Sequence, residues 1–166
     1  MERFFNTSGP NRFDDNYSLN PFKRIDYREI MALIGQKKYF VLSSPSQSGK
    51  TTMLLALMYH LNKDGKFRCI HLDMTFAQEA GDDVRKGMAL IIRELARQAR
   101  DWLGDNWPLD NWQRVLAAAE PEEALYAFLW EWLSQNGQDQ YPLILLLDDM
   151  DALSGDMLVS RPDRFR

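Results

Sequence analysis

The spacing of apolar residues changes period along the chain and predicts alternating helices and strands. An apolar stripe at three- and four-residue spacing predicts a long amphipathic helix over 84–103. Short apolar runs at 39–42 and 143–147 predict buried strands of the kind found in parallel sheets, and a further strand is expected at 67–72. Strands and helices in this order indicate an α/β fold.

The remaining apolar segments predict shorter helices. The segment 53–61 is apolar almost all round, as expected for a helix packed against a sheet, and Gly65 favours its end. Helices are also expected over 26–34, 109–119 and 121–135.

Length and composition favour a single domain. The chain has 166 residues, of which 45% are hydrophobic, enough for a buried core and too many for a disordered protein. We divide it into an N-terminal arm with a short helix, 1–37, and a core, 38–160, that carries a helical insert at 84–135. Turn-forming residues are dense over 6–22, which favours an ordered arm there.

The charge and the cysteine content indicate which binding partners and which cellular compartment to expect. Twenty basic and 24 acidic residues give a net charge of -4, which argues against a general affinity for nucleic acid or for an anionic membrane. The single cysteine, Cys69, excludes an internal disulfide and a cysteine zinc site. No apolar segment reaches the ~18 residues of a membrane helix, so we expect a soluble, cytoplasmic protein. The expected protein partner is a second copy of this chain or an unidentified protein.

A phosphate-binding loop is predicted directly after the first strand. Residues 44–51 match the Walker A pattern GxxxxGK[ST], except that Ser44 stands at the first glycine position. Such a loop runs into a helix N-terminus, whose amides and positive dipole end attract phosphate oxygens. Lys50 is expected to reach the β and γ phosphates, and Thr51 to hold Mg²⁺. The residues expected to bind nucleotide are Ser46, Gln47, Ser48, Gly49, Lys50, Thr51 and Thr52.

A second motif supports the first. Residues 143–148 are five apolar residues followed by Asp148, the Walker B pattern, which places this carboxylate at the carboxyl end of a strand. Ligands of open α/β sheets bind at that edge. Asp148 is expected to hold Mg²⁺ through water, because Mg²⁺ keeps much of its hydration shell.

With these motifs the chain resembles the P-loop ATPases of the AAA-like and STAND-like group, in particular bacterial ATP-binding proteins, from about Phe4 to Ser160. The resemblance implies a three-layer P-loop NTPase core with a mainly parallel sheet. It also implies that Asp149 polarises the attacking water and that Lys50 acts in catalysis. ATP is favoured over GTP, because the nearest approach to a guanine-specific NKxD motif, at 62–65, ends in Gly65.

The resemblance leaves the adenine contacts open. Tyr17, Pro21 and Arg24 are expected either to lie against the adenine or merely to pack on the sheet.

In the AAA-like order, a sensor strand and an arginine finger follow the Walker B strand, and this chain stops at Arg166. We therefore expect a core that is incomplete at its C-terminus, with an empty slot between the strands 39–42 and 143–147. In the kinase and GTPase arrangement these strands would instead be neighbours. Two functions stay open: an ATP-hydrolysing enzyme or switch, and a nucleotide-binding or interaction module without significant turnover.

Other side chains are assigned structural roles. Arg93, Arg97 and Arg100 share one helix face, which we interpret as solvated. Cys69, His60 and His71 lack the spacing of a metal site. Five tryptophans lie in the helical insert. We expect them to pack in the core or in a lid, and the alternative is that they form a surface that binds a partner.

Overall fold

A computed structural model describes residues 22, 26–43, 45, 48–135 and 141–153. Its contacts divide the chain into two compact units, Met1–Asp64 and Gly65–Arg166. The described residues form α-helices and a two-stranded parallel sheet, so the α/β class expected from the sequence is confirmed.

The first unit contains the helices α1, Tyr27–Gly35, and α2, Lys50–Asp64. Asp26 caps α1, since its carboxylate accepts a hydrogen bond from the Glu29 amide at 3.0 Å. Three rings connect the two helices. Phe22 and Tyr27 each lie within 6 Å of the His60 ring centroid, and the Tyr27 hydroxyl hydrogen-bonds to His60 Nε2.

The segment expected to form the first strand has no regular secondary structure. Residues 38–43 lie outside the sheet that the described residues form, so the prediction of a strand at 39–42 is wrong for this structure. Exposure alternates along the segment, with Tyr39 101% and Val41 91% exposed and Phe40 and Leu42 half-buried. The side chains thus keep the period of a strand. What the segment lacks is a hydrogen-bonded neighbour, and an apolar run of four residues cannot specify one.

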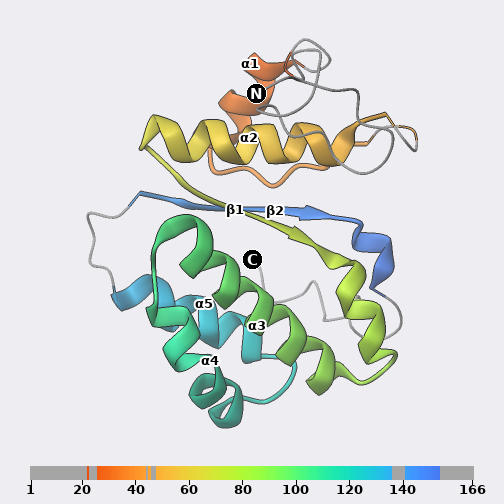
Figure 1. The fold of residues 1–166 in the computed structure, drawn as a ribbon, viewed down its shortest axis with the longest axis vertical. Coiled ribbons are helices and arrows are strands. Elements are labelled where there is room, and N and C mark those ends of the chain that lie inside the picture. The colour runs from red at the N-terminus through yellow and green to blue at the C-terminus, as the bar shows by residue number, and fades with distance from the viewer. Residues whose placement is uncertain (1–21, 23–25, 44, 46–47, 136–140, 154–166) are drawn as a thin grey trace, which may run out of the picture. The chain divides into compact units, whose positions relative to one another are not determined.

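The second unit is built on the sheet. Strands β1, Arg68–Asp73, and β2, Leu143–Asp148, run parallel, and the register pairs Arg68 with Leu143 and Asp73 with Asp148 (Figure 1). The carboxyl ends of both strands therefore meet at one edge. Two short 3-10 helices follow the strands at this edge and contact each other: η2, Met74–Ala80, after β1, and η3, Met150–Ala152, after β2.

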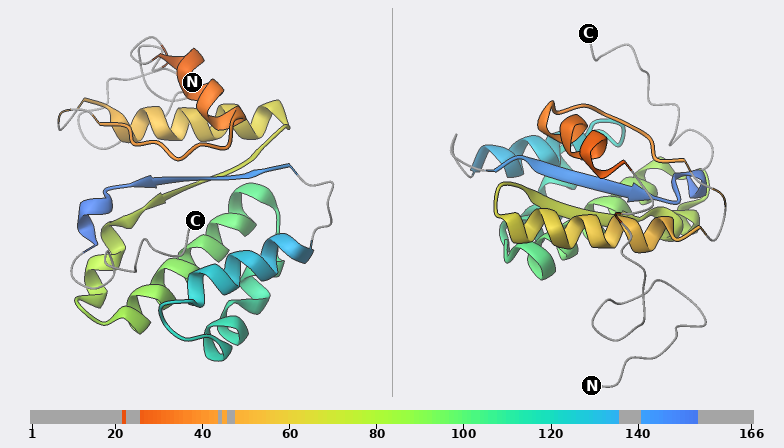
Figure 2. Two further views of the ribbon diagram at one scale, coloured as in Figure 1. Left: turned by 180° about the vertical axis from the view of Figure 1, so that it is seen from behind. Right: turned by 90° about the horizontal axis from the view of Figure 1, so that it is seen from above.

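Three helices cover one face of this sheet. They are α3, Val84–Leu103, α4, Trp107–Ala118, and α5, Ala124–Gln135. Helix α3 packs on β1, while α4 packs on α3 and α5 and lies farther from the sheet in both opposite views (Figures 1 and 2). Gly104 ends α3 in the left-handed conformation, where its amide donates to the last-turn carbonyls of Ala99 and Arg100.

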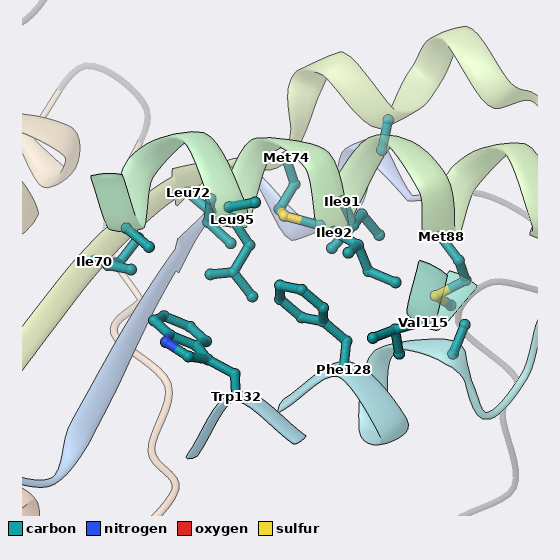
Figure 3. Packing of buried hydrophobic residues seen from close by; sticks show 14 of the residues in the cluster. Ile70, Leu72, Met74, Met88, Ile91, Ile92, Leu95, Val115, Phe128 and Trp132 are labelled. Atoms are coloured by element: carbon teal, nitrogen blue, oxygen red, sulfur yellow. The ribbon is translucent and has the colours of Figure 1, made fainter. Parts of the chain in front are cut away.

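The core lies between the sheet and these helices. Ile70 and Leu72 of β1 point toward the buried stripe of α3, and Phe128 and Trp132 of α5 close the cluster from the other side (Figure 3). The buried residues of α3 are Gly87, Met88, Ile91, Ile92, Leu95, Ala96 and Ala99. This is the stripe that the sequence predicts, apart from its ends, since Val84 is partly buried and Trp102 is 41% exposed.

Most predicted elements are confirmed within a few residues. The long helix begins and ends where its apolar stripe does, and both remaining strands lie within one residue of their expected bounds. Helix α5 begins at Ala124 rather than at Pro121, because 121–123 form a turn before it. The 3-10 helix η2 has no counterpart among the predicted elements.

One carboxylate joins three elements of the second unit. Asp105, in the loop between α3 and α4, accepts hydrogen bonds from Arg68 at the start of β1, from Trp132 Nε1 of α5 at 2.8 Å and from the Trp107 amide at 3.1 Å. The Arg68 guanidinium also lies over the Trp132 ring, 5.3 Å from its centroid. Burial alone would raise the pKa of the Asp105 carboxyl, but these hydrogen bonds and the charge of Arg68 hold that pKa below its ordinary value.

We expect Asp105→Ala to lower the free energy of unfolding by about 3 kcal/mol, because it leaves the fully buried Trp132 indole and the Arg68 guanidinium without this acceptor. Asp101→Ala is the matched control: it removes a carboxylate that pairs with arginines on the exposed face of α3, and should change stability by less than about 1 kcal/mol. Urea denaturation at neutral pH measures both.

The same carboxylate makes stability depend on pH. Because the pKa of Asp105 is lower in the folded than in the unfolded chain, its contribution is complete above about pH 4 and is lost as the pH falls through the lowered pKa. The difference in stability between the wild type and Asp105→Ala should therefore shrink in acid. A difference that stays constant down to pH 2 would contradict this account.

Candidate functional site

The segment that carries the Walker A pattern leads directly into α2. Gly49 has φ +86°, a left-handed conformation that glycine adopts without strain, and α2 begins at the next residue, Lys50. The Ser48 amide donates to the Pro45 carbonyl at 3.3 Å, and the Met53 amide donates to the Gly49 carbonyl at 3.0 Å. The GKT triplet at 49–51 thus lies at the positive end of the α2 dipole.

Part of this segment falls outside the described residues. Ser44, Ser46 and Gln47 belong to that part, as do Tyr17, Pro21 and Arg24, for which an adenine contact was considered. Ser48, Gly49, Lys50, Thr51 and Thr52 are described, and all five are half-buried at the start of the helix.

The carboxyl edge of the sheet carries the acidic residues. Asp73 and Asp148 are register partners, so both side chains belong to the same face of the sheet. Asp73 turns toward its own chain, because its Oδ1 accepts hydrogen bonds from the Thr75 amide at 2.9 Å and hydroxyl at 2.6 Å. Two carboxylates directly opposite each other destabilise a sheet unless a cation or a donor compensates them. The two Thr75 donors compensate the charge of Asp73 in this way.

Asp148 is the most buried acidic residue described, with 2% of its surface exposed. Its Oδ1 accepts a hydrogen bond from the Asp149 amide at 3.1 Å. Asp149 itself adopts the left-handed conformation, with φ 51° and ψ 46°, which aspartate tolerates better than most residues. This sharp change of direction ends β2 and starts η3, so the two aspartates of the Walker B motif differ in role: one lies in the strand and the other forms the bend.

His71 lies on the same face, two register pairs behind the edge. Only 9% of its surface is exposed, and its Nε2 lies 3.7 Å from Oδ2 of Asp148. That distance is too long for a hydrogen bond. Nε2 has no hydrogen-bond partner among the described residues.

Cys69 also belongs to this face and is fully buried. Burial disfavours the thiolate and raises the pKa of the thiol to about 12. A thiol with so little thiolate character at neutral pH is a poor nucleophile and a poor metal ligand. Cys69 is therefore a packing residue, as the sequence analysis concluded.

The structure brings together only part of the predicted site. Asp148 and Asp149 share the carboxyl edge with Asp73 and His71 within the second unit, whereas Lys50 and Thr51 belong to the first unit. Sequence analysis did not assign Asp73 or His71 to the site. The signal for Asp73 was available, since a strand followed by Asp occurs at 68–73 as well as at 143–148. The signal for His71 was not, because it depends on the register between the two strands.

Two other predictions concern surface residues. Arg97 is half exposed and pairs with Glu94 and Asp101, and Arg100 pairs with Asp101 as well, so this helix face is exposed and its arginines are paired within the helix. The tryptophans differ in exposure. Trp132 is fully buried, while Trp130 is 64% exposed and stacks on Tyr126, with ring centroids 6.2 Å apart.

Within the described ranges, no cluster of three or more histidine, cysteine or carboxylate side chains could hold a metal ion by itself. None of the helices described combines the length and the apolar character that a membrane span requires. No protein-family model, no curated protein and no solved structure matches the chain.

The left-handed bend at Asp149 can be tested separately from its carboxylate. Asp149→Gly should leave the free energy of unfolding unchanged or raise it slightly, because glycine adopts φ 51° without strain. Asp149→Val should lower it by about 1–2 kcal/mol, since a β-branched residue is strained there. Chemical denaturation of the two variants gives the difference, and equal stabilities would show that the bend relaxes in the variant.

The buried thiol predicts a second pH dependence. Because the pKa of Cys69 is about 12 in the folded chain and 9.0 for an ordinary thiol, the unfolded chain loses this proton first as the pH rises. The contribution of Cys69 to stability should be complete below pH 9 and fall between pH 9 and about 12. Cys69→Ala should lack this component, and at pH 8 an aromatic disulfide reagent should react far more slowly with the folded than with the unfolded chain.

Proposed function

We propose that this chain is a P-loop nucleotide-binding protein that binds ATP with Mg²⁺, as its resemblance to the AAA-like and STAND-like group implies. The observation that carries the proposal is local: a left-handed glycine, Gly49, followed at once by a helix that starts with Lys50 and Thr51. A phosphate group needs this combination of close backbone approach, a helix N-terminus and a mobile cation. In this proposal the α/β arrangement is part of a three-layer P-loop core.

The second half of the proposed site is the carboxyl edge of the sheet. A Mg²⁺ ion that arrives with a nucleotide takes ligands from the phosphates and from water and needs only one or two protein oxygens. Thr51 and Asp148 would supply these, the first through its hydroxyl and the second through its carboxylate. The fit rests on the buried carboxylate of Asp148 at the strand end and on the opposed Asp73, whose charge a cation would compensate. The ion would neutralise phosphate charge.

Within this proposal Asp149 is the residue that would orient the attacking water. Its half-buried position beside Asp148 supports access to the same edge. Aspartate is one methylene shorter than the glutamate found at this place in many AAA-like proteins, which lowers the expected turnover. Phosphate release by the wild type and by Asp149→Asn is the direct measure of turnover.

The alternative function is a nucleotide-binding or interaction module without significant turnover. The observation that favours it is a stripe on α5: Tyr126, Trp130 and Leu133 follow helical spacing, and each is 45% exposed or more. Large apolar side chains gathered on an exposed face are typical of interaction surfaces. Binding of ATP without phosphate release would support this alternative. Both the hydrolysing and the non-hydrolysing function require the nucleotide to bind.

We expect Lys50→Ala to weaken ATP binding by about 30-fold, since a charge-assisted hydrogen bond to phosphate contributes about 2 kcal/mol. Lys63→Ala is the matched control, because Lys63 lies on the same helix in its last turn. Titration calorimetry with Mg²⁺ and ATP measures both variants. Equal affinities of the wild type and Lys50→Ala would rule out the proposed phosphate site.

A further inference from the structure

Helix α5 carries large apolar side chains on the face opposite to its core contacts. Tyr126, Trp130 and Leu133 are 62%, 64% and 45% exposed, and their i, i+4, i+7 spacing places them in one row, which we call the α5 stripe. Phe128 and Trp132 of the same helix point into the core (Figure 3). Single exposed apolar residues are normal on a protein surface, whereas a contiguous row of them is typical of a binding surface.

The two rings of the α5 stripe are already ordered against each other. Tyr126 stacks on Trp130, with ring centroids 6.2 Å apart and 22° between the ring planes. Stacked aromatic side chains lose little conformational freedom when a partner binds, because they have few rotatable bonds. Their faces also attract cations, above all the planar guanidinium of arginine. The stripe therefore suits a partner that presents both apolar and cationic side chains.

The charge around the α5 stripe is negative. Glu120 and Glu122 are exposed in the segment just before α5, and Glu122 lies one helical turn before Tyr126. The sequence has no lysine, arginine or histidine over 115–160. Arg114 of α4 reaches α5, but its guanidinium pairs with Glu131 at 2.5 Å. Electrostatic complementarity therefore favours a basic partner at this surface.

The same charges and the size of the α5 stripe argue against other occupants. In a two-fold dimer each surface meets its own copy, so the glutamates of one chain would face those of the other. A stable dimer also buries about 800 Å² per partner, and three partly exposed side chains supply roughly half of that area. Nucleic acid and anionic membranes are repelled by the acidic surroundings. A single helix laid along the row needs no larger surface, because seven residues of a helix span about 10 Å.

We propose that the α5 stripe binds a basic amphipathic helix of another protein. The apolar side chains of that helix pack between Tyr126, Trp130 and Leu133, as ridges of one helix pack into the grooves of another. Its arginines stack on the two rings or pair with Glu120 and Glu122. This surface gives the interaction module of the alternative function a class of partner. It lies within the second unit and does not depend on nucleotide binding.

A pair of synthetic peptides tests the proposed chemistry. Each has about 14 residues, with leucines at i, i+3, i+4 and i+7, and carries either arginine or glutamate at the other positions. Fluorescence anisotropy of the labelled peptides, without nucleotide, measures binding to the full chain. We expect the arginine peptide to bind with a Kd of about 10 μM and the glutamate peptide to bind at least about 30-fold more weakly.

Substitutions on α5 locate the binding surface. Tyr126→Gln and Trp130→Gln should each weaken binding of the arginine peptide by about 10-fold or more, as is typical of aromatic residues at the centre of an interface. Tyr59→Gln is the matched control, because Tyr59 is a 52% exposed tyrosine on a helix of the first unit. Glu122→Gln should weaken binding by about 3-fold and reduce its dependence on salt. The midpoints of urea denaturation should stay near that of the wild type, since the replaced side chains are exposed.

The outcomes separate this surface from the nucleotide site. Lys50→Ala should bind the arginine peptide as the wild type does, and a wild type that binds ATP but not the peptide overturns the surface alone. Equal binding of both peptides, or wild-type affinity in Tyr126→Gln and Trp130→Gln, also overturns it. Binding to phosphatidylcholine vesicles in place of the peptide would show a membrane surface. A dimer that Trp130→Gln dissociates would show that a second copy is the partner, and either result overturns the proposal.

Discussion

The parallel register between β1 and β2 is the constraint on which the second unit depends. Because side chains alternate along a strand, one register decides which residues face the helices and which face the opposite side. Ile70 and Leu72 thereby join the helical core, while His71 and Asp148 come to the other face. A slip of one residue would exchange the two sets and would bury the carboxylate in the apolar cluster. The core and the acidic edge are thus two consequences of a single pairing.

Outside the sheet, the Asp105 carboxylate connects the start of β1 to α4 and α5. The carboxylate accepts hydrogen bonds from Arg68, at the start of β1, and from Trp132 of α5. It also accepts a hydrogen bond from the Trp107 amide, at the start of α4. The charged pair is mostly buried, and Asp105 also accepts hydrogen bonds from Trp132 and Trp107, which favours a stabilising pair. Since the contact lies at the amino end of β1, stability and the proposed chemistry occupy opposite ends of the same strand.

Negative charge is concentrated at the carboxyl edge, and close behind it lies His71 Nε2, which has no hydrogen-bond partner among the residues that the structure describes. Asp73, Asp148 and Asp149 lie there, and of these Asp148 is almost completely buried. A fold that only had to be stable would gain by replacing such groups with apolar ones. Local violations of this kind are typical of sites where a ligand completes the structure. The proposed Mg²⁺ would compensate the negative charge of this edge.

The segment before α2 shows which structural features neighbouring residues can determine by themselves. Gly49 provides the left-handed conformation, and the helix that follows provides a dipole, so both features are predictable from neighbouring residues alone. The apolar run at 39–42 shows the opposite case. Its side chains keep the alternation of a strand, but a strand also needs a neighbouring chain, and nothing local specifies one.

The sequence by itself determined the features that depend on neighbours along the chain. These are the α/β alternation, the bounds of α3 from its apolar stripe, the strands near 68–73 and 143–148, and a helix over 53–61 that α2 contains. Only the tertiary structure decided the pairing of Asp73 with Asp148, the place of His71 beside that edge and the contacts of Asp105. Each of these joins residues far apart in the chain. Periodicity shows which face of an element is apolar, whereas register and packing against other elements decide which polar residues meet.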